Sequence, residues 1–402
     1  MVALTTLAQI GTVMGIAIFP VIAPKLAADM GVEPSLIGYQ MSLIYGAAAL
    51  SSPFLTWMVT RHGACRAIQA GLVLSVVALA LALVSGLAAL VVASILLGAA
   101  MSVMTPAGAH VLFRFSPPQH RNLLFSIKQT CVPAGWMIVA LVAPALTLSY
   151  GWKWAIVLVI GFALLMVVAL QAVRATWDDD RGAHSGGVRQ QAREGMRLLW
   201  QVAELRWLSM ASLFMSGVQL CLSAFAVTML VQEAGYGLVA AGVMLSVAQG
   251  AGVTGRIIWG WIADRTGHCL RLLLTLSGVM VVCCVVMAFV TPQWPRGLMA
   301  ALFLVFGASA IGWNGLFLAE VARLSPQGKV SVATSGAMVW NFAGILTGPA
   351  LFALAYRVNG SYAMTYGLLT LYAIAGFGFL CLSLASARRR AVADLPVRAQ
   401  SQ

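Results

Sequence analysis

Long apolar segments alternate with short polar stretches along the whole chain, and twelve of the apolar segments are long enough to cross a bilayer. An α-helix needs about 20 apolar residues to span the hydrocarbon layer. The pattern therefore predicts an all-α membrane protein with twelve transmembrane helices. The predicted spans are 4–28, 35–60, 65–86, 89–115, 123–148, 151–174, 204–232, 237–263, 270–291, 296–322, 331–357 and 361–387.

The spacing of small and polar residues in the first half of the chain returns in the second half. Gly38 and Gly46 return 204 positions later as Gly242 and Gly250, and beyond them the offset becomes 209. At that offset, Gly98 corresponds to Gly307, Arg114 to Arg323, Gly135 to Gly344 and Gly151 to Gly360. Membrane transporters use such repeats to build a midplane site that opens alternately to either side. We predict two pseudo-symmetric six-helix bundles, 1–174 and 204–387, joined by a linker, 175–203, and followed by a tail, 388–402.

Composition and charge agree with this topology. The chain is 61% hydrophobic and 9% charged, whereas soluble domains carry roughly 25% charged residues. Its net charge of +13 is concentrated in the loops that follow the even-numbered spans. The positive-inside rule places these loops, the linker, the tail and both termini in the cytoplasm. We therefore predict an integral protein of the bacterial inner (plasma) membrane, and not a nucleic-acid-binding protein.

Neither the cysteines nor the linker suggest a cofactor. The seven cysteines are odd in number and lie in predicted spans or cytoplasmic turns, so we expect reduced thiols. In the linker, His184 and the three acids at 178–180 lack the spacing of metal ligands. We expect no metal and no other cofactor.

The loop between the eighth and ninth spans carries the most specific motif. It contains Gly260, Asp264, Arg265 and Gly267 in the pattern G-x-x-x-D-R-x-G, followed by Arg271. This loop resembles the signature loop of the major facilitator superfamily of membrane transporters. The first half keeps part of the same pattern as Arg61, Gly63 and Arg66, but has Thr56 and Thr60 in place of the first Gly and the Asp. The resemblance covers the whole chain and implies secondary transport by alternating access.

A glutamate near the end of the tenth span suggests a gate. Glu320 is followed by Arg323, an arrangement that resembles the Glu-then-Arg segment of sugar porters in that superfamily, where it pairs with the signature loop. An acid inside a span is expected to be paired, and Glu320 is the one acid that we place inside a span. We predict a charged cluster that closes the cytoplasmic side in the outward-facing state: Asp264, Arg265, Arg256, Glu320 and Arg323. A proton site at Glu320 is the alternative interpretation.

The first half has no acid at the matching gate positions. No acidic residue lies between Glu33 and Asp178. We therefore predict that the gate of the first half is the weaker one and rests on helix packing and water.

Lys128 lies inside the fifth predicted span, in this acid-free region. A buried cation without an acid needs water, carbonyl groups or an anionic ligand. Lys128 could instead extend to the inner headgroups, and both interpretations stay open. The segment 126–130, followed by Pro133 and Gly135, also resembles the fifth helix of cyanate and organic-anion transporters of the superfamily.

The resemblance implies a central cavity lined by helices 1, 4, 7 and 10, with help from helices 2, 5, 8 and 11. Polar and aromatic residues near the middle of these spans are therefore candidate substrate contacts. They are Gln9, Tyr45, His110, Lys128, Gln129, Gln219, Gln249, Trp313, Asn314 and Asn341. Any single one of them could equally hydrogen-bond a neighbouring helix. His110 could shuttle protons near neutral pH or be a structural histidine.

These features predict a secondary active transporter that moves a small polar solute, an organic anion, together with protons. Such a symporter would act as a monomer in the lipid bilayer. Export of amphipathic drugs is the alternative within the superfamily, although the fifth span lacks the longer Gly-Pro motif of the antiporters. An integral membrane enzyme or sensor is disfavoured, because no nucleotide-binding loop, zinc-protease pair or soluble domain is present. We expect no catalytic residues.

Overall fold

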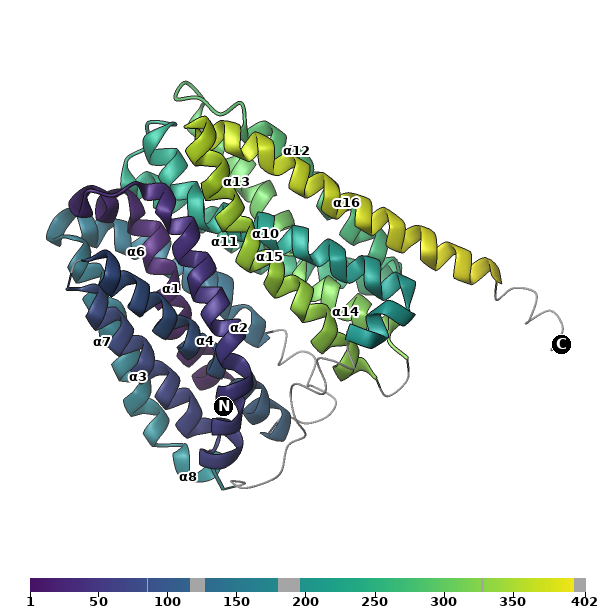
Figure 1. Cartoon of the computed structure of the whole chain (residues 1–402), viewed down its shortest axis with the longest axis horizontal. Coiled ribbons are helices and arrows are strands. Elements are labelled where there is room, and N and C mark those ends of the chain that lie inside the picture. The colour runs from purple at the N-terminus through teal and green to yellow at the C-terminus, as the bar shows by residue number, and fades with distance from the viewer. Residues whose placement is uncertain (85, 116–126, 180–195, 327–328, 394–402) are drawn as a thin grey trace.

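The computed structural model describes the chain except for residues 85, 116–126, 180–195, 327–328 and 394–402. All regular structure in the described part is helical, and Figure 1 shows the helices gathered in two bundles. The first bundle contains α1 (Val2–Met30), η1 (Pro34–Leu36), α2 (Ile37–His62), α3 (Ala64–Ala82), α4 (Leu87–Phe115), α6 (Cys131–Tyr150), α7 (Trp152–Gln171) and the short α8 (Arg174–Trp177).

The second bundle repeats this order. It contains α10 (Ala203–Gln232), α11 (Leu238–Thr266), α12 (Cys269–Met287), α13 (Arg296–Ala310), α14 (Asn314–Leu324), α15 (Val330–Asn359) and α16 (Tyr362–Ala393). Eleven helical segments of the described residues are long and apolar enough to cross a membrane. The remaining predicted span is α2, which has 26 residues and packs between α4 and α15. The all-α, twelve-helix prediction is confirmed.

The tenth predicted span is not one continuous helix. It consists of α13 and α14, which are separated at residues 311–313. Side chains of α11 bind the backbone carbonyls at this break: Trp259 Nε1 donates to the Ala308 carbonyl at 2.8 Å, and Arg256 Nε donates to the Ile311 carbonyl at 3.1 Å. These carbonyls would otherwise accept bonds from the helix itself. The tenth predicted span is therefore present as Arg296–Leu324, with an interruption of its helix at 311–313.

Both described chain ends lie at the same end of the bundles, which we call the termini face (Figure 1). The ribbons of the two bundles diverge toward the termini face and come together at the opposite face. The helices that pair across the bundle interface are α2 with α15, α6 with α11, and α1 with α10.

Two glycines from the repeat allow the bundles to meet toward the opposite face. A Cβ atom at Gly38 would overlap the Pro349 carbonyl oxygen, and a Cβ atom at Gly242 would overlap the Ala140 carbonyl oxygen. The two contacts are equivalent, because Gly38 and Gly242 are repeat counterparts and so are Ala140 and Pro349. The absence of a side chain lets one helix backbone approach the other. Beside the Gly38 contact, Ser42 donates to the Leu346 carbonyl at 2.6 Å.

Acids at the opposite face join helix ends within each bundle. In the first bundle, Asp29 accepts a hydrogen bond from Trp152 Nε1 at the start of α7, at 2.9 Å. In the second bundle, Glu233 accepts from the backbone N–H groups of Tyr362 and Ala363 at the start of α16, the latter at 2.8 Å. A carboxylate at a helix N-terminus also meets the positive end of the helix dipole.

Candidate functional site

Lys128 lies inside the first bundle and does not reach its surface. Its side chain is 2% exposed, and its Nζ lies 3.5 Å from the Thr105 carbonyl oxygen of α4. A Cβ atom at Gly108 would come within 2.7 Å of the lysine Cε, so the glycine leaves the space that the lysine fills. Of the two interpretations left open by the sequence, this geometry matches a buried cation and not one extended to the headgroups.

Arg256 of α11 crosses the interface and bonds to the first bundle. Its Nη1 donates to the Gln129 carbonyl at 2.6 Å, while its Nε holds the Ile311 carbonyl of its own bundle. In a continuous helix the Gln129 carbonyl would accept from the residue four positions later, but that residue is Pro133, which has no N–H. The guanidinium therefore replaces a hydrogen bond that the proline removes.

Lys128 thus belongs to the short segment to which Arg256 bonds, and this segment ends at the turn at Thr130. Within the described residues, both cations contact backbone carbonyls, and neither is paired with a carboxylate. A carbonyl dipole compensates a buried charge only in part. The start of the fifth span therefore carries one buried lysine, and its neighbour Gln129 is bound by an arginine of the other bundle.

A polar network in the second bundle adjoins the break between α13 and α14. Gln219 of α10 accepts hydrogen bonds from Trp313 Nε1 at 3.1 Å and from Asn314 Nδ2 at 3.0 Å. Asn314 lies three residues after Ile311, and Arg256 donates to the Ile311 carbonyl. The network therefore connects Arg256, at the bundle interface, with Gln219 of α10. Trp313 is fully buried in this arrangement and acts as a hydrogen-bond donor within the bundle.

The other candidate residues are distributed around the helices. Gln249 is buried and donates to Ser223 Oγ at 3.0 Å. Gln9 and Asn341 are buried, and the Gln9 Oε1 and Asn341 Nδ2 atoms have no hydrogen-bond partner among the described residues. Tyr45 is half-buried in α2, and His110 is exposed on α4. The structure therefore brings Lys128 and Gln129 together with Arg256, and it places His110 outside the buried group.

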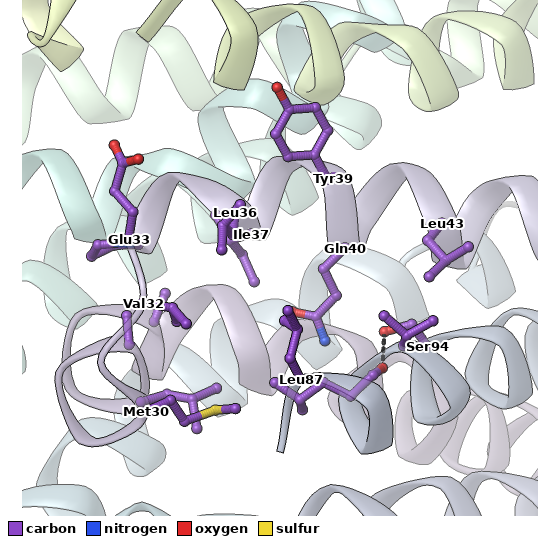
Figure 2. A pocket seen from close by; sticks show the side chains of 16 residues that line it. Met30, Val32, Glu33, Leu36, Ile37, Tyr39, Gln40, Leu43, Leu87 and Ser94 are labelled. Carbon is purple, nitrogen blue, oxygen red and sulfur yellow. Dashed lines mark hydrogen bonds between the residues drawn. The ribbon is translucent and has the colours of Figure 1, made fainter. Parts of the chain in front are cut away.

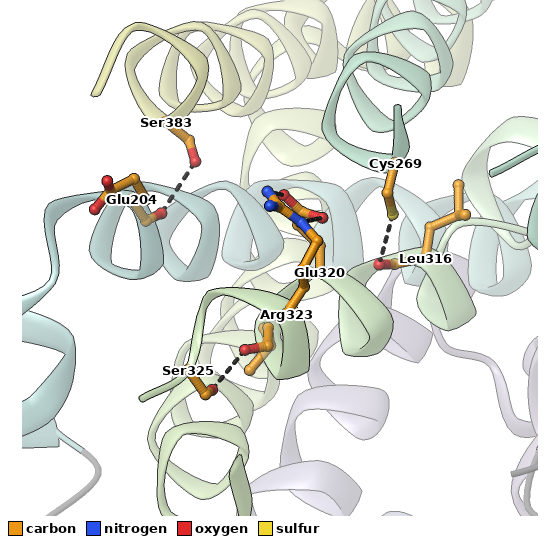
Figure 3. Close-up of polar contacts among 8 residues, drawn as sticks. Glu204, Cys269, Leu316, Glu320, Arg323, Ser325 and Ser383 are labelled. Carbon is orange, nitrogen blue, oxygen red and sulfur yellow. Dashed lines mark hydrogen bonds and ion pairs between the residues drawn. The ribbon is translucent and has the colours of Figure 1, made fainter. Parts of the chain in front are cut away.

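Part of the predicted gate cluster is formed. Arg323 binds Glu320 through two hydrogen bonds, from Nε to Oε2 at 2.8 Å and from Nη2 to Oε1 at 2.5 Å (Figure 3). Asp264 and Arg265 are exposed, and the Arg265 guanidinium lies over the Trp261 ring at 4.2 Å. Arg256 points instead to the first bundle. The full cluster predicted for the outward-facing state is not assembled in this arrangement.

The rest of the signature loop takes the form of a turn. Gly267 ends α11 with a left-handed φ of 67°. A Cβ atom at Gly260 would meet nothing within 4 Å, and Arg271 is exposed in the first turn of α12.

Glu320 is not alone as a buried acid. Glu204 lies in the first turn of α10 and is 5% exposed, and its backbone carbonyl accepts from Ser383 at 3.0 Å (Figure 3). The prediction that Glu320 is the one acid inside a span is therefore wrong. The start of α10 is buried against α16, so a residue at the predicted edge of the membrane lies inside the bundle.

Two acids that follow α7 and α8 in the chain, Asp178 and Asp179, contact the first bundle. Asp178 is 3% exposed and caps α3, accepting from the N–H of Cys65 at 2.7 Å and from that of Arg66 at 3.2 Å. Gly63 precedes them with a φ of 95°, and a Cβ there would overlap the Asp178 carboxylate. Asp179 forms an ion pair with Arg114, the repeat counterpart of Arg323.

This end of the first bundle therefore does contain acids, since Asp178 caps α3 and Asp179 pairs with Arg114. Sequence reasoning assigned Asp178 and Asp179 to the linker. The signal that could have identified them is a run of acids after a chain segment that has none.

A separate, mostly apolar cavity of about 210 Å³ lies near the opposite face, between the end of α1 and the starts of α2 and α4. Figure 2 shows Gln40 and Tyr39 on successive positions of α2, with Gln40 near Leu87 and Ser94 of α4. This cavity involves neither Lys128 nor Arg256.

Comparison with known proteins agrees with the geometry. The family model described as the Major Facilitator Superfamily matches residues 5–349. An uncharacterised MFS-type transporter of Mycobacterium tuberculosis (strain ATCC 25618 / H37Rv) is 26% identical over 180 residues, which make up 43% of this chain. The match spans 38% of that relative's own length.

Solved transporters share the fold. A bacterial homologue of the human lysosomal transporter Spinster, in an inward-facing and occupied conformation, matches with a TM-score of 0.73 and 14% identity over 96% of both chains. A peptide transporter, POT, in complex with sulfate matches with a TM-score of 0.75 and 16% identity over 96% of this chain and 94% of that one. At these identities the likeness shows the fold alone.

Proposed function

The chain belongs to the Major Facilitator Superfamily of membrane transporters, and we propose that this member moves a small organic anion together with protons. Secondary transport by alternating access follows from the family. The anionic substrate rests on one observation: the buried Lys128 is the neighbour of Gln129, whose carbonyl is bound by Arg256 of the other bundle.

An anion bound between these cations would contact both bundles. Lys128 belongs to the first bundle and Arg256 to the second, and in the described arrangement Arg256 bonds to the Gln129 carbonyl across the interface. An anionic ligand would compete with that carbonyl for the guanidinium. A ligand that replaces the bond between Arg256 and the Gln129 carbonyl binds one conformation of the bundles more tightly than the other. This difference in affinity shifts the equilibrium between the two conformations. The proposal thus couples substrate binding to the movement of the bundles.

The distribution of charge supports an orientation. Exposed arginines gather at the termini face, among them Arg61, Arg66, Arg265 and Arg271. The positive-inside rule then places the termini face in the cytoplasm of a bacterial cell. The glycine contacts hold the bundles together toward the opposite face, so the described arrangement corresponds to an inward-facing state under this proposal.

Uptake into proteoliposomes tests the proposal. Purified protein is reconstituted, and saturable uptake is measured for a panel of labelled mono- and dicarboxylates and for organic cations, with and without an inward proton gradient. We expect saturable uptake of an anion that the gradient accelerates. Lys128→Ala lowers this uptake roughly 100-fold, as the loss of a buried charge-assisted contact predicts. The matched control is Lys153→Ala, because Lys153 is exposed on α7 beside Trp152.

The alternative within the family is export of amphipathic compounds. The apolar cavity near the opposite face is the observation that favours it, because amphipathic drugs bind largely through apolar contacts. Saturable transport of an organic cation, unaffected by Lys128→Ala, would replace the anion proposal with this one.

A further inference from the structure

A basic hollow lies on the first bundle at the termini face, away from Lys128. It has a volume of about 360 Å³ and is formed where α2 ends, α3 begins and α8 follows α7. Its lining residues are Met58, Arg61, His62, Arg66, Ala70 and Arg174. The transport proposal does not use this surface.

The fold holds two of these arginines in place. Arg66 lies in the first turn of α3, where its backbone N–H is bound by Asp178 and its Nη1 donates to Gln69 Oε1 at 3.3 Å. Arg174 begins α8, the short helix that carries Asp178 at its end. The Asp178 carboxylate is buried against the N-terminus of α3, where it accepts hydrogen bonds from the backbone N–H groups of Cys65 and Arg66.

A second hollow continues the first along α3 and α7. It shares Arg66 and Ala70, and it adds Gln69, Val73, Val167, Val168 and Gln171. Gln69 Nε2 donates to Gln171 Oε1 at 3.2 Å and to the Val167 carbonyl at 2.9 Å. Beyond these amides, Val73 is 45% exposed and Val168 is 70% exposed. The surface therefore changes from arginines to amides to exposed valines along the direction of two spanning helices.

We propose that this groove binds an anionic phospholipid of the leaflet at the termini face. The order of its side chains matches the order of a phospholipid, in which a phosphate is followed by ester groups and acyl chains. Arg61, Arg66 and Arg174 bind the phosphate, and an acyl chain lies along Val73 and Val168. Basic pockets beside spanning helices are suited to anionic headgroups, and arginine binds phosphate through paired N–H donors.

The repeat shows that this groove is specific to the first bundle. The counterpart of Arg174 is Ser383, which is buried and donates to the Glu204 carbonyl at 3.0 Å. The second bundle carries exposed arginines in the matching loop, Arg265 and Arg271, but has Ser383 at the position that corresponds to Arg174. This asymmetry supplies a control with the same change in charge.

The test measures lipid retention and not transport, so its outcome is independent of the proposed substrate. Delipidated protein in detergent is mixed with phosphatidylglycerol or phosphatidylcholine, and bound lipid is counted by native mass spectrometry. The groove variant is Arg66→Gln with Arg174→Gln, which keeps the backbone N–H that Asp178 binds. The control variant is Arg265→Gln with Arg271→Gln. Circular dichroism and thermal unfolding check that both variants are folded.

We expect wild-type protein to retain phosphatidylglycerol in preference to phosphatidylcholine. The groove variant should bind it roughly 30-fold more weakly, as expected for two arginines near a headgroup, while the control changes little. Val168→Gln, which changes the acyl path without altering charge, should also weaken retention.

Three outcomes would overturn the proposal. Equal loss in the groove and control variants would indicate general attraction between charges. Stabilisation of the protein by inorganic phosphate, with phosphatidylglycerol adding nothing, would indicate a site for a free anion. Unchanged retention of phosphatidylglycerol by Val168→Gln would show that the acyl chain does not lie in the groove.

Discussion

The two bundles have the same helices and the same close contacts, yet they differ at the positions that carry charge. Gly38 and Gly242 make equivalent backbone contacts with the opposite bundle. In contrast, Lys128 has Ala337 as its counterpart, and Arg256 has Ser52. Each bundle therefore has one cation, at or bonded to the segment 128–129, that the repeat does not match. The comparison teaches that the repeat preserves the geometry of the interface while the chemistry of the site has become asymmetric.

The gates differ in the same way. In the second bundle, Arg323 takes its acid from the same helix, three residues before it. In the first bundle, the counterpart Arg114 forms an ion pair with Asp179, which lies beyond α7 in the chain. The arginines are equivalent, but the acids that pair with them come from different places in the sequence.

The largest expected effect on anion uptake comes from substituting the unmatched cations, Lys128 and Arg256. Lys128→Ala should lower anion uptake roughly 100-fold, and Lys128→Arg should retain part of it, because the charge remains while its geometry changes. Arg256→Gln should also lower uptake, since it loses the guanidinium that bonds to the Gln129 carbonyl. Proteoliposome uptake measures all three variants. If Arg256→Gln transports as wild type, the site belongs to Lys128 alone and the comparison of two unmatched cations fails.

The glycine contacts test the symmetric part of the comparison. Gly38→Leu and Gly242→Leu each introduce a side chain where backbone atoms of the opposite bundle lie. Both variants should open the opposite face and raise the labelling of a single cysteine placed near Ser42, with transport reduced at least about tenfold. Their effects should be similar in size. Gly161→Leu is the control, because a Cβ there would meet nothing within 4 Å. A response to one glycine only would contradict their equivalence.

The buried acid that caps α3 in the first bundle provides a smaller effect. Asp178→Asn removes the carboxylate that binds two N–H groups at the start of α3. Hydrogen bonds to a buried charged group are worth about 2 kcal/mol, so thermal unfolding should begin at a lower temperature. Asp264→Asn is the matched variant of the second bundle, and because Asp264 is exposed it should change stability little. Equal destabilisation by both substitutions would show that the two gates are alike after all.

The sequence predicts the parts of this structure that depend on local pattern. Span lengths follow from apolar segments, and the glycines of the interface follow from the repeat. The break between α13 and α14 was not predictable in this way, because it depends on Trp259 and Arg256 of another helix binding its carbonyls. Asp178 was missed for the same reason, since its partners lie more than 100 residues away.

The candidate site was predicted in part. Lys128 stood out because no acid lies near it in the sequence, and its burial agrees with that reasoning. Arg256 was assigned to the gate, whereas it bonds to Gln129 in this arrangement. The link between them is Pro133, whose missing N–H leaves the Gln129 carbonyl available. A proline four residues after a polar position is visible in a sequence, but the donor that replaces its N–H is set by how the bundles pack.

The smallest expected effect comes from giving the first bundle the acid that its loop lacks. Thr60→Asp restores the signature pattern, and the simplest expectation from the sequence is a shift toward the outward-facing state. Asp178 already caps the N-terminus of α3, however, so this helix end has an acid without the substitution. We therefore expect little change in the accessibility of a cysteine at the termini face in Thr60→Asp alone. In the background of Asp178→Asn, the same substitution should recover part of the lost stability. A strong outward shift in the single variant would mean that Asp178 does not serve as the acid of this gate.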